Sequence, residues 1–261
     1  MQIGKMKASL RILLCGVFLL GCNPAETGVS HRDILDDYKA LNIRVGRVSH
    51  PLLVANHDIC DQTIDDNGIR WHQLEDYPED LQPVAQSYWD VSETRSIFYV
   101  LPGSEADKAG LKSGDRPSDS VLDEIGTETV CRYAVLVSYV DEINAYATGN
   151  EIIVTSGMLR SVENDKYLAL ILSHEMSHNV LGHVDNPDVI DIEDQADQAA
   201  IKLMARAGLD FEEAIESREQ YQQSSANGGQ LPVTEKDRIA KFKSYSQSTK
   251  SKQSKGEAVW P

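Results

Sequence analysis

The sequence predicts an α+β fold that combines buried helices with a small β-sheet. The segment 168–183 is largely apolar and carries polar residues spaced at one helical turn. Two short strand-like runs, 143–147 and 151–155, are joined around Gly149-Asn150, a pair that suits a tight hairpin turn. A second helical pattern over 192–204 is rich in alanine, so two helices can approach closely there. The chain length of 261 residues suits one moderately large domain, or a domain plus a small module.

The chain begins with the pattern of a signal peptide over residues 1–21. Three basic residues precede the apolar run Ile12–Leu20. A helix needs about 20 apolar residues to cross a bilayer, and this run is too short. We therefore expect export and removal of the segment.

The end of this segment, Leu19-Leu20-Gly21-Cys22, resembles the bacterial lipobox, whose cysteine is diacylated and becomes the mature N-terminus. The resemblance implies a lipid anchor at Cys22, with residues 22–30 as a polar tether to the membrane. Ordinary signal cleavage nearby is the alternative. Asn23 is not the aspartate that often retains such lipoproteins at the inner membrane. The periplasmic face of the outer membrane is therefore the expected location.

Cysteine usage agrees with export. Of the four cysteines, Cys15 lies in the signal and Cys22 is the expected lipidation site, which leaves Cys60 and Cys131. Two remaining thiols in an oxidising compartment predict one disulfide. Two buried free cysteines are the alternative.

The formal net charge of -16 argues against some partners. Nucleic acid and anionic lipid are poor partners for the body of so acidic a protein. We expect contact with the membrane through the lipid anchor alone.

Before the hairpin the chain predicts one long helix and one small module. Apolar residues recur at helical spacing over 31–60, with a possible kink at Pro51. The region 61–130 is polar and loop-rich, with a strand at 96–100. A turn, a short helix and a glycine-bounded turn follow, in a run that resembles the PDZ modules of bacterial proteases. We expect a PDZ-like insertion over about 90–125, with a plain surface insertion as the alternative.

The helix over 168–183 carries a candidate zinc site. His174 and His178 are four residues apart, so both imidazoles lie on one helix face, and Glu175 lies beside them. Two histidines can bind zinc, which lowers the pKa of a bound water to about 7. A neighbouring carboxylate can take a proton from that water and pass it to a leaving amine. Asn164 and Asp165 are candidate caps of this helix.

Two histidines leave zinc short of one protein ligand. A third histidine in the frame HExxHxxGxxH fails, because Leu181 and Val184 occupy the glycine and histidine positions. His183 is one residue short of that frame and fits a packed helix end. A carboxylate from the following helix is the other source of a ligand.

In that helix Glu193 and Asp197 are four residues apart and share a face. Glu193 is the expected metal ligand, and Asp197 the expected acceptor for a ligand histidine. Asp191 and Asp194 are competing carboxylates.

Residues 131–211 resemble peptidase family M48, the gluzincin group that includes HtpX-type and CAAX prenyl proteases. The resemblance rests on several stretches in the right order, which are NAYATG at 144–149, IIVTSGML at 152–159, HEMSH with His183, EDQAD at 193–197 and ARAGLD at 205–210. It implies a zincin-like metallopeptidase domain over 131–243 that uses one zinc ion.

The resemblance also implies roles for single residues. The family's ExxxD motif supports Glu193 as the third zinc ligand. Its NA-containing strand supports Asn144, Ala145 and Tyr146 as the edge that binds substrate backbone. The expected partner is an unfolded or envelope polypeptide.

The sequence departs from the family at two places. Only fourteen residues separate His178 from Glu193, which is shorter than in many relatives. Many members also carry a His-Pro before a late arginine, whereas Leu231-Pro232 precedes Arg238 here. A Ser-, Lys- and Gln-rich tail over 244–261 is expected to be disordered.

Three functions fit these patterns. A zinc endopeptidase of the cell envelope is the first, and a non-proteolytic PDZ-like envelope chaperone or assembly lipoprotein is the second. A zinc hydrolase acting on a non-peptide envelope substrate is the third. Glu175 argues against the second, because a structural metal site needs no general base.

Overall fold

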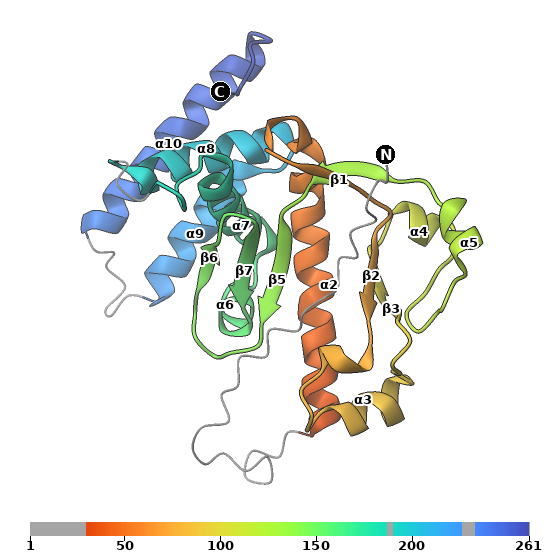
Figure 1. Ribbon diagram of the computed structural model, residues 1–261. Helices are drawn as coiled ribbons and strands as arrows, with labels where there is room; N and C mark the ends of the chain where they lie inside the picture. The colour runs from red at the N-terminus through yellow and green to blue at the C-terminus, as the bar shows by residue number, and fades with distance from the viewer. Residues whose placement is uncertain (1–29, 187–189, 226–232, 261) are drawn as a thin grey trace. The chain divides into compact units, whose positions relative to one another are not determined.

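The computed structural model describes residues 30–186, 190–225 and 233–260 (Figure 1). The expected signal peptide, Cys22 and most of the tether lie outside these residues. The chain divides into two compact units. The first comprises the chain up to Arg47 together with 65–128 and 136–140, and the second comprises 48–64, 129–135 and 141–261.

The first unit contains most of one long helix and several short elements. Its elements are α2 (His31–Ala55), whose end belongs to the second unit, β2 (Ile69–His72), the 3-10 helix η2 (Leu74–Asp76), α3 (Gln82–Trp89), β3 (Ser96–Val100), α4 (Glu105–Lys108) and α5 (Asp119–Asp123). Strands β2 and β3 form an antiparallel pair. Apolar residues of α2, η2 and α3 form a core cluster that includes Leu35, Leu81 and Ala85.

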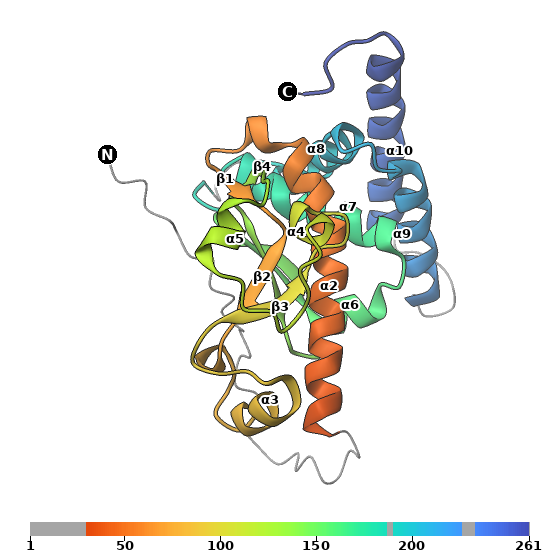
Figure 2. The same cartoon turned by 90° about the vertical axis from the view of Figure 1, so that its right-hand side faces the viewer.

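The second unit contains the hairpin and the remaining helices (Figures 1 and 2). Its elements are the 3-10 helix η1 (His57–Ile59), β6 (Ala145–Ala147), β7 (Glu151–Thr155), α6 (Ser156–Ser161), α7 (Asp165–Val180), α8 (Ile192–Arg206), α9 (Phe211–Ser225) and α10 (Val233–Ser254). Strands β1 (Thr63–Asp66), β4 (Glu128–Cys131) and β5 (Ala134–Ser138) each hold residues of both units. Strand β1 pairs with β4, and β5, β7 and β6 form a three-stranded sheet in that order.

The predicted hairpin is present, with β6 at the edge of its sheet. Strands β6 and β7 are antiparallel, with Tyr146 opposite Ile153. The turn contains Gly149 at φ 97°, a left-handed conformation that glycine adopts without steric cost. Residues 152–155 of β7 are buried, so this central strand is covered while β6 stays at the border.

Helix α7 runs through the middle of the second unit. Asn164 caps it, and its side chain accepts hydrogen bonds from the backbone N–H groups of Lys166 and Tyr167, as the sequence predicts. The helix is buried on most sides, which explains why its sequence shows no clean polar face. Helix α8 packs against it, and its small side chains Ala196 and Ala200 are fully buried.

Helices α9 and α10 lie side by side next to α7 and α8 (Figure 2). At the start of helix α9, the N–H of Glu213 donates to Oδ1 of Asp210 at 3.0 Å. The expectation of a disordered tail over 244–261 is wrong, because α10 continues to Ser254. Its buried stripe at helical spacing includes Phe242, Ser246 and Thr249. Two of these three residues are polar, so hydropathy alone does not reveal the stripe.

Other expectations are refined by the structure. Ahead of the hairpin, β4 ends at Cys131 and β5 begins at Ala134. Strand β3 occupies 96–100 as predicted, and α4 follows it after a turn. Whether this segment is a PDZ-like module stays a prediction.

The disulfide expected between Cys60 and Cys131 is present, with the Cα atoms 5.7 Å apart. It joins the end of the α2–η1 segment to β4. Among the described residues, no helix combines the length and apolar character that spanning a membrane requires.

Candidate metal centre

Two histidines of α7 face each other one helical turn apart. The Nε2 atoms of His174 and His178 are 3.1 Å from each other, and both side chains are about 12% exposed. The i, i+4 spacing on a helix produces this arrangement. The pair is therefore held by the most buried helix of the second unit rather than by a loop.

Helix α8 brings a carboxylate to the same point. Glu193 Oε2 lies 3.3 Å from Nε2 of His174, and Glu193 Oε1 lies 3.5 Å from Nε2 of His178. The competing carboxylates are placed differently. Asp194 accepts hydrogen bonds from Lys241 and Tyr245, each at 2.7 Å, and Asp191 lies at the N-cap of α8.

The three donors fit a tetrahedral zinc ion. With bonds of about 2.0–2.1 Å, tetrahedral ligand atoms lie about 3.3 Å from one another. The two histidine nitrogens are 3.1 Å apart, and Oε2 of Glu193 lies 3.3 Å from His174 while Oε1 lies 3.5 Å from His178. With one donor atom taken from each residue, all three atoms lie within 4.8 Å of one another. Two imidazole nitrogens and one carboxylate oxygen are also a donor set that zinc favours, and they leave a fourth position open.

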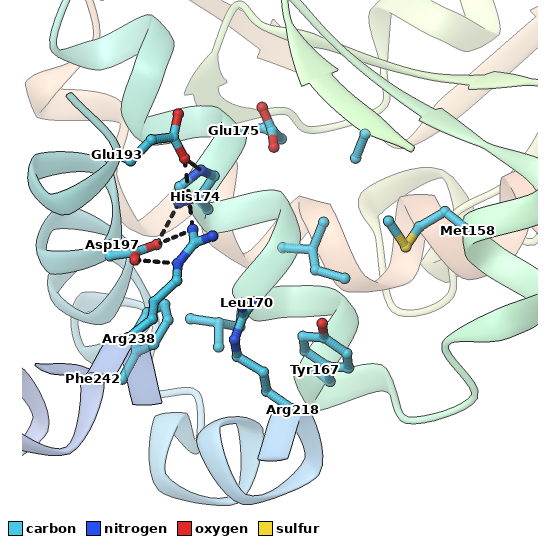
Figure 3. Close-up of a pocket in the computed structure, with 12 residues that line it drawn as sticks. Met158, Tyr167, Leu170, His174, Glu175, Glu193, Asp197, Arg218, Arg238 and Phe242 are labelled. Carbon is cyan, nitrogen blue, oxygen red and sulfur yellow. Dashed lines mark hydrogen bonds and ion pairs between the residues drawn. The ribbon is translucent and has the colours of Figure 1, made fainter. Parts of the chain in front are cut away.

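Asp197 contacts the donor His174, and Arg238 contacts Asp197 (Figure 3). Asp197 Oδ1 lies 2.8 Å from Nδ1 of His174, on the side of the ring away from Nε2. Two nitrogens of Arg238 donate to the same carboxylate at 2.6 and 2.7 Å. Arg238 also lies 3.7 Å from Glu193. Asp197 is almost completely buried, so the bidentate arginine compensates a charge that would otherwise be costly there.

The two histidines differ in protonation in the metal-free protein. Burial alone would lower the pKa of His174, but the carboxylates of Asp197 and Glu193 raise it to about 9. Burial, and the neighbouring His174, lower the pKa of His178 to about 4. Below about pH 9, His174 therefore carries a proton that a metal must displace.

Glu175 lies beside the donors but points to a different part of the site (Figure 3). Burial raises the pKa of its carboxyl group to about 7, partly offset by His174 and by a hydrogen bond with the backbone of Ala147. A carboxyl group with a pKa near 7 can both accept and donate a proton at neutral pH.

The edge strand β6 runs past Glu175. Asn144 pairs with β7, since its carbonyl accepts from the N–H of Thr155 at 3.0 Å, and Thr148 pairs with Glu151 at 3.0 Å. In an antiparallel ladder these pairs alternate with residues whose backbone groups point to the outer side. Ala145 and Ala147 occupy those outward positions.

The three residues predicted to bind substrate differ in their positions. Ala145 lines the cavity at the site. Asn144 bonds back to β7 and, through its side chain, to Glu142 at 3.2 Å. Tyr146 is 40% exposed.

Sequence reasoning missed Asn179. Its side-chain oxygen accepts from the N–H of Gly149 at 2.7 Å, and its amide nitrogen donates to the carbonyl of Glu151 at 3.1 Å. These two bonds attach the hairpin turn to α7. Asn179 directly follows the second histidine, and a buried polar residue in an apolar helix was the available signal.

A cavity of about 230 Å³ extends from the donors along α7. One end is polar, with His174, Glu175 and Arg238, and the other is lined by Met158 and Tyr167, among others (Figure 3). Pockets for drug-sized ligands measure about 300–1,000 Å³, so this one suits a single side chain better.

A His-Glu-x-x-His helix with a carboxylate from the next helix is an arrangement typical of metallohydrolases. Comparison of the sequence with known protein families is consistent with that class. The sequence model of Peptidase family M48 matches residues 104–190, about a third of the chain, which supports a relationship to these metallopeptidases. The match includes α7 and ends before Glu193, so the third donor rests on the geometry. No curated protein was found to match the chain.

Proposed function

We propose that this protein is a zinc-dependent endopeptidase that hydrolyses peptide bonds of cell-envelope polypeptides. The single observation that carries the proposal is the position of Glu175. It is a half-buried carboxyl group with a pKa of about 7, next to three converging donors and the edge strand β6. A structural metal site would not need such a group.

His174, His178 and Glu193 would hold the metal. Zinc at such a site supplies a Lewis acid for the scissile carbonyl and makes water more acidic. Asp197 orients His174 through Nδ1, so that Nε2 faces the metal position. Glu175 takes the proton of the attacking water on its carboxylate and delivers it to the leaving amine.

The edge of β6 would align the substrate. An extended peptide can add a strand to an exposed sheet edge through backbone hydrogen bonds, largely independent of its sequence. The outward backbone groups of Ala145 lie beside the cavity and suit this role. A substrate side chain would then enter the apolar end of the cavity.

The pairing of the two arginines that line the cavity favours an endopeptidase over a carboxypeptidase. A carboxypeptidase needs a cation for the terminal carboxylate of its substrate. Arg218 is paired with Glu235 at 2.8 Å, and Arg238 is paired with Asp197. Both cations on the cavity wall are therefore already neutralised.

The envelope location is part of the proposal. It is supported by the signal-like start with its lipobox-like Cys22, and by a disulfide, which persists in oxidising compartments. Unfolded or damaged envelope polypeptides are the proposed substrates, because strand addition needs an extended chain.

The test is the substitution Glu175→Gln. It keeps the shape of the side chain and removes the proton acceptor, so zinc binding should persist while hydrolysis of an unfolded protein falls by about 10²–10⁴-fold. Glu216→Gln, an exposed change on α9, is the matched control and should keep full activity.

Full activity of the Glu175→Gln protein would refute the proposed mechanism. If wild-type protein binds unfolded chains tightly but cleaves none, a binding function in envelope assembly is the better account.

A further inference from the structure

The end of α7 folds back on itself and places His183 against His178. The N–H of Gly182 bonds to the carbonyl of Asn179 at 3.1 Å, and the N–H of His183 bonds to the carbonyl of His178 at 2.9 Å. Gly182 is left-handed at φ 67°. This is the Schellman motif, in which the residue after the glycine typically makes an apolar contact with the residue five positions earlier. Here that contact joins two imidazoles.

The contact is short and buried. Nδ1 of His183 lies 3.0 Å from Nδ1 of His178, and the ring centroids are 5.1 Å apart. His183 is only 4% exposed. Its other nitrogen, Nε2, lies 3.4 Å from Oε1 of Gln195 on α8, and the amide nitrogen of Gln195 donates to the carbonyl of Ile190 at 3.1 Å.

The protons of His178, His183 and Gln195 can be assigned in one consistent way along these contacts. A metal bound through Nε2 of His178 requires the proton of that ring on Nδ1. This Nδ1–H can donate to Nδ1 of His183, which places the proton of His183 on Nε2, facing the oxygen of Gln195. The amide of Gln195 is oriented by its bond to Ile190, so its oxygen is the end that faces His183.

We propose that His183 is a positioning residue that fixes the tautomer and ring orientation of His178 for metal binding. The proposal rests on the metal centre proposed above. The two donor histidines would then have different supports. His174 faces the charged Asp197, whereas His178 faces a neutral imidazole, which orients the ring without adding negative charge to the site.

The test compares zinc affinity among three proteins by competition with a chelator. His183→Leu keeps the apolar bulk but removes the acceptor, and it should weaken zinc binding by about 10–100-fold. His183→Asn places an oxygen near the former Nδ1 and should bind within about threefold of wild type. Thermal unfolding of the metal-free proteins shows whether each variant is folded.

A second readout follows the tautomer directly. In metal-free protein with ¹⁵N-labelled histidine, where no metal selects the tautomer, NMR at neutral pH should show the proton of His178 on Nδ1 in wild type and in His183→Asn. In His183→Leu, the same ring should show a larger share of the tautomer that is protonated on Nε2. A merely structural role would leave the tautomer ratio of His178 unchanged.

Equal zinc affinity in wild type and folded His183→Leu protein would overturn the inference while leaving the metal centre intact. So would an Asn variant as weak as the Leu variant. Wild-type protein that binds no zinc would contradict the metal centre itself, and the inference with it.

Discussion

Three carboxyl groups within one site have different protonation because their surroundings differ. Burial raises the pKa of Glu175 to about 7. Burial also acts to raise the pKa of Asp197, but His174 and Arg238 outweigh it, so the pKa falls. A hydrogen bond with His174 lowers the pKa of Glu193. Glu175 therefore has a pKa near neutral pH, whereas Asp197 and Glu193 stay ionised. This difference suits Glu175 to carrying a proton, Glu193 to binding the metal and Asp197 to orienting His174.

Zinc binding at pH 8 should release about one proton from His174. The pKa of His174 is raised from 6.5 to about 9 in the metal-free protein, so the ring is still protonated at pH 8 and must lose that proton to bind. Calorimetry in two buffers of different ionisation enthalpy measures the release.

The release should be about one proton smaller above about pH 10 than at pH 8, because His174 is already neutral there. Asp197→Asn serves as the control, because it removes a charge that raises the pKa and should reduce the release at pH 8. Zinc binding without proton release at pH 8 in wild type would contradict this assignment.

Five residues of the site were predictable from the sequence. His174, Glu175 and His178 follow from one helical turn, and Glu193 and Asp197 follow from the spacing in the next helix together with its resemblance to the ExxxD motif. The role of Arg238 depends on a contact to another element, since its partner Asp197 lies 41 residues away in sequence. Spacing within one helix cannot reveal such a contact.

At the scale of elements, α7 positions two of the three metal donors and the proposed substrate edge. His174 and His178 lie on one face of this helix, and Asn179 attaches the β6–β7 turn to it. The proposed peptide-binding edge and the two histidine donors are therefore held by the same helix, which favours precise geometry between substrate and metal.

Asn179→Leu should weaken the attachment of the hairpin to α7 without disturbing the histidine donors. It removes both bonds to the hairpin turn and leaves the N–H of Gly149 without its acceptor, while the carbonyl of Glu151 keeps its bond from the N–H of Thr148. We expect KM for an extended peptide to rise by roughly 10-fold, equivalent to about 1.4 kcal/mol, while zinc affinity stays near wild type.

Asn186→Leu is the matched control, since this exposed asparagine bonds only locally, to the carbonyl of Gly182. It should change neither quantity. Unchanged peptide kinetics in Asn179→Leu would show that the turn does not need its attachment to α7.

The elements themselves were predictable where periodicity was strong. The hairpin, α7 and α8 follow from alternation, capping and alanine spacing. Helix α10 was missed because its buried stripe uses serine and threonine, and its partners α8 and α9 are separate elements. Tertiary packing decided the structure of that segment, as it often does when local preference is weak.

At the scale of the whole molecule, one disulfide closes a long loop. Cys60 and Cys131 are 71 residues apart, and the chain between them holds most of the first unit. The sulfur of Cys131 also lies 3.3 Å from the carbonyl of Asn56, whose side chain donates to the carbonyl of Leu203 on α8. The bond therefore secures chain segments of the second unit that are distant in sequence.

Removing the disulfide should lower the free energy of unfolding by about 2–4 kcal/mol, because the unfolded chain regains the freedom of an open loop. The double substitution Cys60→Ser/Cys131→Ser, measured by urea unfolding, gives the value. Reductant should shift the unfolding midpoint of wild type and leave that of the double variant unchanged. A wild-type midpoint that does not respond to reductant would contradict this prediction.

The central claim is that one metal at His174, His178 and Glu193 drives peptide hydrolysis. Metal-free protein, prepared with a chelator, can be titrated with zinc while the rate of hydrolysis of an unfolded protein is followed. The account predicts no hydrolysis without metal and a rate that rises to a break at one equivalent of zinc. Hydrolysis that persists in the metal-free protein, or none after zinc has bound in full, would contradict it.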